Sequence, residues 1–209
     1  MLKSTLLATT ASVLIISPAL AGNLAVIDVA AAAITIPATN DWSGLYAGGL
    51  VSFDSGELQY LKGTSEGPID SLGSTTSVGG FAGYNIQRGA LVFGGEIAAT
   101  NGGIALEDNS DYSYGPIIDL KARVGYSFGK VLAYGVAGMS FSTYDSNGSD
   151  QYASSGFAYG AGVDVMLGAN MFVGAEYLMR EIEGYGASNT LSGRRGFIDS
   201  AQILVGWNF

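Results

Sequence analysis

The stretch IDSAQILVGWNF, residues 198–209, alternates between two kinds of side chain along most of its length. Counting back from the end, every second residue is apolar or small: Phe209, Trp207, Val205, Ile203 and Ala201. The residues between them are polar or small, apart from Leu204. A period of two indicates a β-strand with two environments. In a soluble sandwich the apolar face would point to a core, whereas in a membrane barrel it would point to lipid and the polar face to the lumen.

Seven earlier segments also have strand character, and the connections between all eight alternate strictly between long and short. The seven segments are residues 42–54, 76–87, 91–100, 117–128, 131–144, 154–167 and 171–183. The long polar connections are residues 55–75, 101–116, 145–153 and 184–196, and the short turns are 88–90, 129–130 and 168–170. Short turns at one end and long loops at the other are typical of outer-membrane barrels. We therefore predict an all-β, eight-stranded antiparallel up-and-down transmembrane β-barrel.

Two of these segments leave their faces ambiguous. Glycines fall on both faces of residues 42–54, and residues 131–144 are apolar or small on both faces. The alternation therefore does not say which side chains of these two strands point into the lumen. We do expect the last strand to pair with residues 42–54, because closing the sheet leaves no free edge.

The first 41 residues are expected to lie outside the barrel. Residues 1–21 combine a short basic start with an apolar segment and an A-x-A cleavage pattern that ends at Ala21, as in a secretory signal peptide. The apolar segment is too short to cross a bilayer as a helix. We expect cleavage after Ala21, an Ala-rich lead-in linker over residues 22–41, and one barrel domain over residues 42–209.

Composition excludes several classes of function. The formal net charge is −9, and removing residues 1–21 would take away Lys3 and no acid, leaving −10. Nucleic acid is therefore not an expected partner, because phosphate binding needs clustered Lys and Arg. The chain has no Cys and no His. Since His is the commonest general base and transition-metal ligand, we predict no enzymatic activity, no cofactor and no metal site.

Hydropathy agrees with a membrane barrel. The mean hydropathy is +0.30, yet the barrel segment has no run of 18 apolar residues. Apolar residues that alternate onto a lipid-facing surface explain both observations, and a large buried core is the other explanation. Aromatic residues near strand ends are interpreted as interfacial belts: Trp42, Tyr84, Phe93, Tyr126, Phe128, Trp207 and Phe209.

Charged residues on the predicted lumen faces are the candidate site. They are Glu96, Asp119, Lys121, Arg123, Asp164, Glu176 and Arg180. The interior of an eight-stranded barrel is just wide enough for side chains to fill, and charges buried there must pair. We predict an ion-pair network that fills the lumen. The alternative readings of these residues are a gate or narrow conductive path, and a catalytic carboxylate pair.

Six stretches carry a resemblance to a known family: DWSGLYAGG at 41–49, GGFAGYNIQ at 79–87, LVFGGEIAA at 91–99, LKARVGYSF at 120–128, VGAEYLM at 173–179 and ILVGWNF at 203–209. Together they resemble the small outer-membrane β-barrel proteins of alphaproteobacteria, the outer-membrane immunogenic or porin family, related to the membrane domain of outer-membrane protein A. Members commonly have an Arg after the EY pair. Here Leu178 replaces it and Arg180 follows, so the charge pattern of the lumen is expected to differ.

The resemblance implies an outer-membrane location and a structural and surface role in the envelope. It also implies that Phe209, with Trp207, Val205 and Ile203, forms the signal read by the outer-membrane insertion machinery. The expected surroundings are outer-membrane lipid and lipopolysaccharide, with the chain as a monomer. Arg194 and Arg195 either meet lipopolysaccharide phosphates or form a solvated loop pair. A narrow porin-like channel, a lipid-modifying enzyme and a soluble lipocalin-like barrel remain as rival functions.

Overall fold

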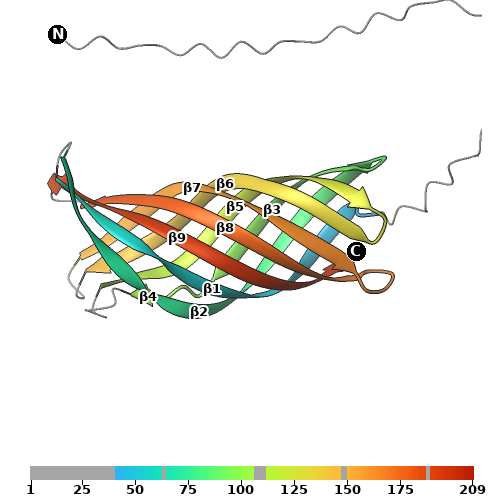
Figure 1. The fold of residues 1–209 in the computed structure, drawn as a ribbon, viewed down its shortest axis with the longest axis horizontal. Helices are drawn as coiled ribbons and strands as arrows, with labels where there is room; N and C mark the ends of the chain where they lie inside the picture. Colours follow the sequence, from blue (N-terminus) through green and yellow to red (C-terminus); the bar gives the residue numbers. More distant parts are fainter. Residues whose placement is uncertain (1–40, 63–64, 106–111, 147–149, 187–188) are drawn as a thin grey trace, which may run out of the picture. The chain divides into compact units, whose positions relative to one another are not determined.

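The computed structural model describes residues 41–62, 65–105, 112–146, 150–186 and 189–209. They form eight long antiparallel strands that close into a barrel, together with the two-residue strand β4 (Figure 1). The strands are β1 (Gly44–Lys62), β2 (Ser65–Arg88), β3 (Leu91–Thr100), β4 (Ile104–Ala105), β5 (Tyr112–Phe128), β6 (Val131–Ser146), β7 (Asp150–Met166), β8 (Met171–Gly186) and β9 (Asn189–Asn208). Among these residues, none forms a helix long and apolar enough to cross a membrane. The predicted signal peptide, residues 1–21, and the lead-in up to residue 40 lie outside the described residues.

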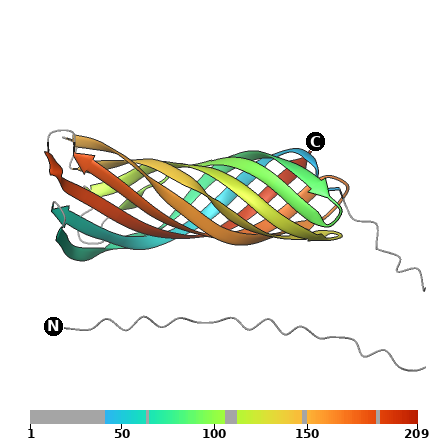
Figure 2. The same cartoon turned by 90° about the horizontal axis from the view of Figure 1, so that it is seen from above.

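Each long strand pairs with its neighbours in the sequence, and the two ends of the sheet meet. β1 pairs with β9 in an unbroken antiparallel register, with Ala47 opposite Trp207 and Phe53 opposite Ala201. β3 pairs directly with β5, while β4 pairs with β5 beyond the end of β3. Figure 2 shows the tilted strands winding around one axis. The predicted eight-stranded up-and-down barrel, closed between its first and last strands, is confirmed.

The outer face carries an apolar belt. Trp207, Val205 and Ile203 on β9 and Phe209 directly after it are exposed, while the residues between them are buried, as predicted. On β5 the outward apolar side chains run from Ile118 to Phe128. Ten residue steps of about 3.3 Å, tilted by about 40°, give a height of about 25 Å, which matches the apolar band of outer-membrane barrels.

The strands continue well beyond this belt at the end opposite the short turns, and here the prediction was wrong. Residues 55–75 were expected to form a loop, but β1 runs to Lys62 and β2 begins at Ser65. Register shifts between Asp54 and Gly56 and between Gln59 and Leu61 change which residues point inward. These irregularities hide the period of two, although backbone pairing continues. Most of residues 184–196 and parts of 101–116 and 145–153 are likewise in strands.

The inner face settles the two ambiguous strands. In β1 the inward residues include Tyr46, Leu50 and Asp54, and in β6 they include Leu132 and Tyr134. Glycines on the inner face leave room for inward rings: a methyl group added to Gly83 would overlap the ring of Tyr46, and one on Gly162 would overlap Tyr134. The inner wall is thus shaped to accept large side chains.

Trp42 lies inside the barrel and not in the interfacial belt, which corrects the prediction. It is 1% exposed, and its indole Nε1 donates a hydrogen bond of 3.2 Å to the carbonyl of Gly129. Its ring also packs edge-on against Phe172, with 6.0 Å between centroids. The glycines after Trp42 left its orientation open in the sequence. The other six predicted belt aromatics are exposed: Tyr84, Phe93, Tyr126, Phe128, Trp207 and Phe209.

We expect a charged side chain on the outer face to lower the stability of the barrel by an amount that depends on its depth in the belt. Val124→Arg, near mid-belt on β5, is expected to lower the free energy of unfolding in lipid vesicles by about 2–4 kcal/mol. Leu91→Arg, beside a short turn, is expected to cost only about 0–1 kcal/mol because an arginine there reaches water. Denaturant titration of both variants in the same vesicles measures the difference. Equal costs would contradict the placement of the belt.

Candidate functional site

All seven charged side chains predicted for the lumen point into the barrel and are at most 4% exposed. β5 contributes Asp119, Lys121 and Arg123 as a column, because alternate residues of a strand share a face. The others come from three further strands: Glu96 from β3, Asp164 from β7, and Glu176 and Arg180 from β8. The closed sheet brings these four strands around one narrow space.

Lys121 bridges two glutamates across the lumen. Its Nζ lies 2.9 Å from Glu96 Oε1 and 2.5 Å from Glu176 Oε1. β3 is the direct neighbour of β5, whereas β8 is on another part of the wall, so one ammonium group links both sides of the barrel. An ammonium with both carboxylates in contact is compatible with its full burial.

Arg123 is held by charge and by aromatic rings. Its guanidinium contacts Asp164 Oδ2 at 2.6 Å and Glu96 Oε2 at 3.4 Å. The Arg123 Cζ atom lies 3.8 Å from the ring centroid of Tyr134 and 5.3 Å from that of Tyr46. The Tyr46 hydroxyl donates a 2.9 Å hydrogen bond to Glu96 and accepts one of 3.1 Å from Arg123. Cation–π contacts of this kind stabilise an arginine that has left water.

A second cluster forms around Arg180. Its Nε and Nη2 donate to the two oxygens of Asp119 at 2.9 and 2.7 Å, a bidentate pair. Ser140 also donates to Asp119. This pair spans from β8 to β5, so it crosses the lumen as the Lys121 bridge does.

Asp54 extends the second cluster to β1 and was missed by the sequence analysis. Arg180 donates to Ser200, and Ser200 donates to Asp54. Ser52 and Ser77 also donate to the Asp54 carboxylate. Glycines fall on both faces of residues 42–54, so the sequence did not show which face of this strand, and hence whether Asp54, points inward. Counting inward from Tyr46 by twos, once that residue is known to be buried, would have found it.

The buried charges are unequal in number. Among the described residues, five carboxylates face three cations: Asp54, Glu96, Asp119, Asp164 and Glu176 against Lys121, Arg123 and Arg180. Glu176 and Gln202 are direct cross-strand partners, yet Glu176 Oε2 and Gln202 Oε1 have no hydrogen-bond partner in the described structure. Lys121 and Arg123 each contact two carboxylates, and Arg180 contacts one directly, so the buried layer has an excess of negative charge. Losing a cation should cost more than losing a carboxylate.

Apolar layers lie on both sides of this charged layer. Toward the short turns, the rings of Trp42, Tyr46, Phe81 and Phe172 meet with centroids 6.0 to 6.2 Å apart. Toward the other end a separate buried cluster spans the lumen: Leu58, Leu72, Ile104, Tyr114, Ile117, Ile182 and Ile198. Along β8 the buried side chains change from Phe172 through Glu176, Leu178 and Arg180 to Ile182.

Arg194 and Arg195, which the sequence placed in a loop, lie on β9. The Arg194 guanidinium lies over the ring of Tyr60, 4.4 Å from its centroid. Arg195 contacts Glu183 at 2.5 Å and Glu181 at 3.3 Å. In the part of the chain that the structure describes, no group of three or more Asp or Glu residues is arranged to hold a metal ion.

Comparisons with known proteins agree with this architecture. The family described as "Outer membrane protein beta-barrel domain" matches residues 20–209. The 22 kDa outer membrane protein of Rhizobium leguminosarum bv. viciae is 28% identical over 142 residues, which cover 65% of this chain and 62% of that protein. That match spans less than two thirds of the relative's length. The 25 kDa outer-membrane immunogenic protein of Brucella abortus biovar 1 is 30% identical over 176 residues, covering 79% of this chain and 77% of that protein.

Solved structures include a more distant likeness. Neisserial surface protein A is 17% identical, and the match covers 80% of this chain and 98% of that one with a TM-score of 0.48. The attachment invasion locus protein of Yersinia pestis is 14% identical, with coverage of 80% and 99% and a TM-score of 0.46.

The excess of carboxylates predicts an asymmetry between two substitutions at one ion pair. Lys121→Met leaves Glu96 and Glu176 buried without their shared cation and is expected to lower the free energy of unfolding by about 3–5 kcal/mol. Glu176→Gln keeps the shape, leaves Lys121 paired with Glu96 and supplies a donor for Gln202. It is expected to cost less than about 2 kcal/mol. Denaturant titration in vesicles measures both, and a costlier Glu176→Gln would contradict the interpretation.

Proposed function

Because the chain belongs to the outer membrane protein β-barrel family, we propose that it is a closed barrel with a structural and surface role in the envelope. The resemblance to alphaproteobacterial outer-membrane proteins predicted from the sequence is confirmed, as is the outer-membrane location. We assign no catalytic role and no cofactor to the chain.

The layered interior is the observation that carries this proposal. Four packed aromatic rings lie toward the short turns, buried charges and aliphatic side chains fill the middle, and a second apolar cluster lies toward the other end. Paired charges in the middle layer support a rigid filling, because each cation joins strands on different parts of the wall. The rings of Tyr46 and Tyr134 pack against Gly83 and Gly162, which also supports a rigid, filled lumen. The lumen network thus serves to hold the wall together.

A narrow channel for small solutes is the alternative, and the charged layer is the feature that favours it. Charged rings in pores select ions. For conduction, however, the apolar layers on both sides would have to move, and Trp42 is tied to the Gly129 turn by its indole. We therefore place the channel second.

The proposed surroundings follow from the outer face. Outer-membrane lipid contacts the apolar belt. The short turns face the periplasm, and the strand ends that extend beyond the belt face lipopolysaccharide outside the cell. The chain works as a monomer and does not bind nucleic acid. Phe209, Trp207, Val205 and Ile203 act as the signal for the outer-membrane insertion machinery, supported by their exposure on the lipid face of the closing strand.

Conductance tests the closed lumen. Refolded protein in planar bilayers is expected to show no steady openings, because the lumen is filled at three levels. Faster gel migration before boiling than after it verifies that the sample is folded. Reproducible single-channel steps from such a sample would instead support the channel.

Replacing the terminal aromatic residue tests the assembly signal. Phe209→Ala is expected to lower the amount of protein in the outer membrane of cells several-fold, with little change in refolding yield in vesicles. Phe128→Ala is the matched control, since Phe128 is also an exposed aromatic at the short-turn end of the belt, on β5. Equal losses in cells for the two variants would argue against a special role of the C-terminal residue.

A further inference from the structure

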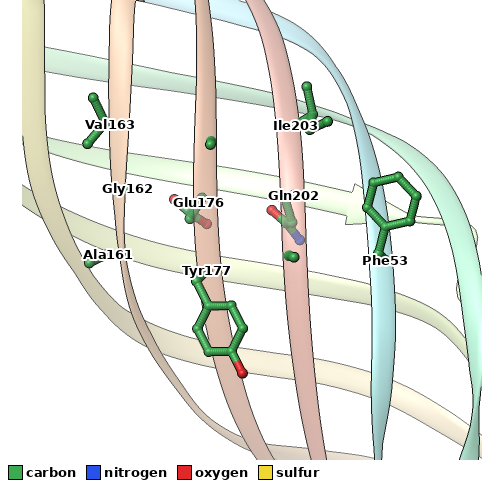
Figure 3. Close-up of a pocket in the computed structure, with 10 residues that line it drawn as sticks. Phe53, Ala161, Gly162, Val163, Glu176, Tyr177, Gln202 and Ile203 are labelled. Carbon is green, nitrogen blue, oxygen red and sulfur yellow. The ribbon is translucent and has the colours of Figure 1, made fainter.

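An apolar groove lies on the outer face over β7, β8, β9 and β1. It has a volume of about 530 Å³. Figure 3 shows Phe53, Tyr177 and Ile203 around it, and these side chains are each about half exposed. The small residues Ala175 and Ala201 lie between them and leave the space open. The groove is part of the lipid-facing belt, so the acyl chains of membrane lipids are in contact with it.

Two polar hollows continue the groove along β1. The first, of about 250 Å³, shares Phe53 with the groove and is otherwise lined by polar residues, among them Ser55 and Thr75. The second, of about 510 Å³, shares Ser55 with the first and includes Glu57 and Asp199. Along β1, the surface therefore changes from the apolar groove to hollows that carry hydroxyl and carboxylate groups.

The polar hollows begin at the edge of the apolar belt. Ser55 and Glu57 follow Phe53 by two and four residues on β1, which places them about 5 to 10 Å further along the barrel axis. Tyr177 joins the two regions, because its ring borders the groove and its hydroxyl interacts with Asp199. The hollows thus occupy the level of lipid head groups when the groove is occupied by an acyl chain.

The chemistry of the polar hollows selects among head groups. None of the described residues that line them is Lys or Arg, whereas Glu57 and Asp199 are carboxylates. Arg195, further along β9, is already held by Glu181 and Glu183. A phosphate would meet negative charge here, while sugar hydroxyls can donate to carboxylates and exchange hydrogen bonds with seryl and threonyl groups.

We propose that this face seats one glycolipid of the outer leaflet, with an acyl chain in the groove and an uncharged saccharide head in the polar hollows. The proposal rests on the orientation given under the proposed function, but not on whether the lumen conducts. A second barrel fits the face less well, because its convex wall would bridge the groove and leave its floor empty.

Native mass spectrometry of the refolded protein, with a diglucosyl diacylglycerol as probe, tests the proposed glycolipid site. Wild type is expected to retain one molecule of this lipid in preference to phosphatidylglycerol or phosphatidylethanolamine with the same acyl chains. Ala175→Leu with Ala201→Leu fills the groove and should abolish the adduct. Ala122→Leu with Ala137→Leu is the control, since these exposed residues pair on β5 and β6, away from the groove; it should leave the adduct at the wild-type level.

A second variant tests the head-group hollows. Glu57→Ala with Asp199→Ala should remove the preference for the glycolipid while lipid of some kind is still retained. The proposal is overturned if wild type prefers phospholipids or phosphorylated lipopolysaccharide. It is also overturned if the groove-filling leucine variant and the control leucine variant lose the lipid adduct to the same extent, or if the groove-filling variant disrupts a dimer instead of a lipid adduct. Gel mobility before boiling shows that each variant is folded, and the adduct is read independently of conductance.

Discussion

Every backbone amide and carbonyl within a bilayer must find its hydrogen bond inside the protein, and the pairing of β1 with β9 is what satisfies this requirement here. Without that ladder the sheet would keep two unpaired edges in lipid. Closure also fixes the size of the interior, because eight strands enclose a space that side chains can fill. The ion pairs, the inward rings and the apolar belt all follow from this closed wall.

Once the wall is closed, the interior charges depend on one another. Lys121 on β5 binds Glu176 on β8, and Arg180 on β8 binds Asp119 on β5, so both ion pairs join strands that are not neighbours in the sheet. Because carboxylates outnumber cations, the serine hydroxyls around Asp54 supply hydrogen bonds where cations are lacking. The outer face has the opposite character, with small side chains that leave a groove between larger ones. The same alternation of side chains along each strand therefore places the charged residues in the lumen and the apolar residues on the outer face.

Much of the fold could be predicted, and particular residues show why the rest could not. The alternation in residues 117–128 and 198–209 gave both faces of β5 and β9, since one face is apolar throughout. Trp42 was misplaced because the glycines that follow it, Gly44, Gly48 and Gly49, carry no information about the inner and outer faces. The strand extensions were read as loops because register shifts near Asp54 break the period of two. Outside the belt, polar residues can face water on a paired strand as readily as in a loop.

By itself, the sequence determined the number of strands, their antiparallel order and the set of seven charges that point inward, because period-two alternation depends only on local strand geometry. Only the tertiary structure decided which of those charges meet, since Glu176 reaches Lys121 across the lumen and not along the chain. It also placed Asp54, Tyr46 and Tyr134 around them and formed the outer groove from strands distant in sequence. These contacts depend on closure and register, and a slip of one residue would turn every side chain of a strand to the other face.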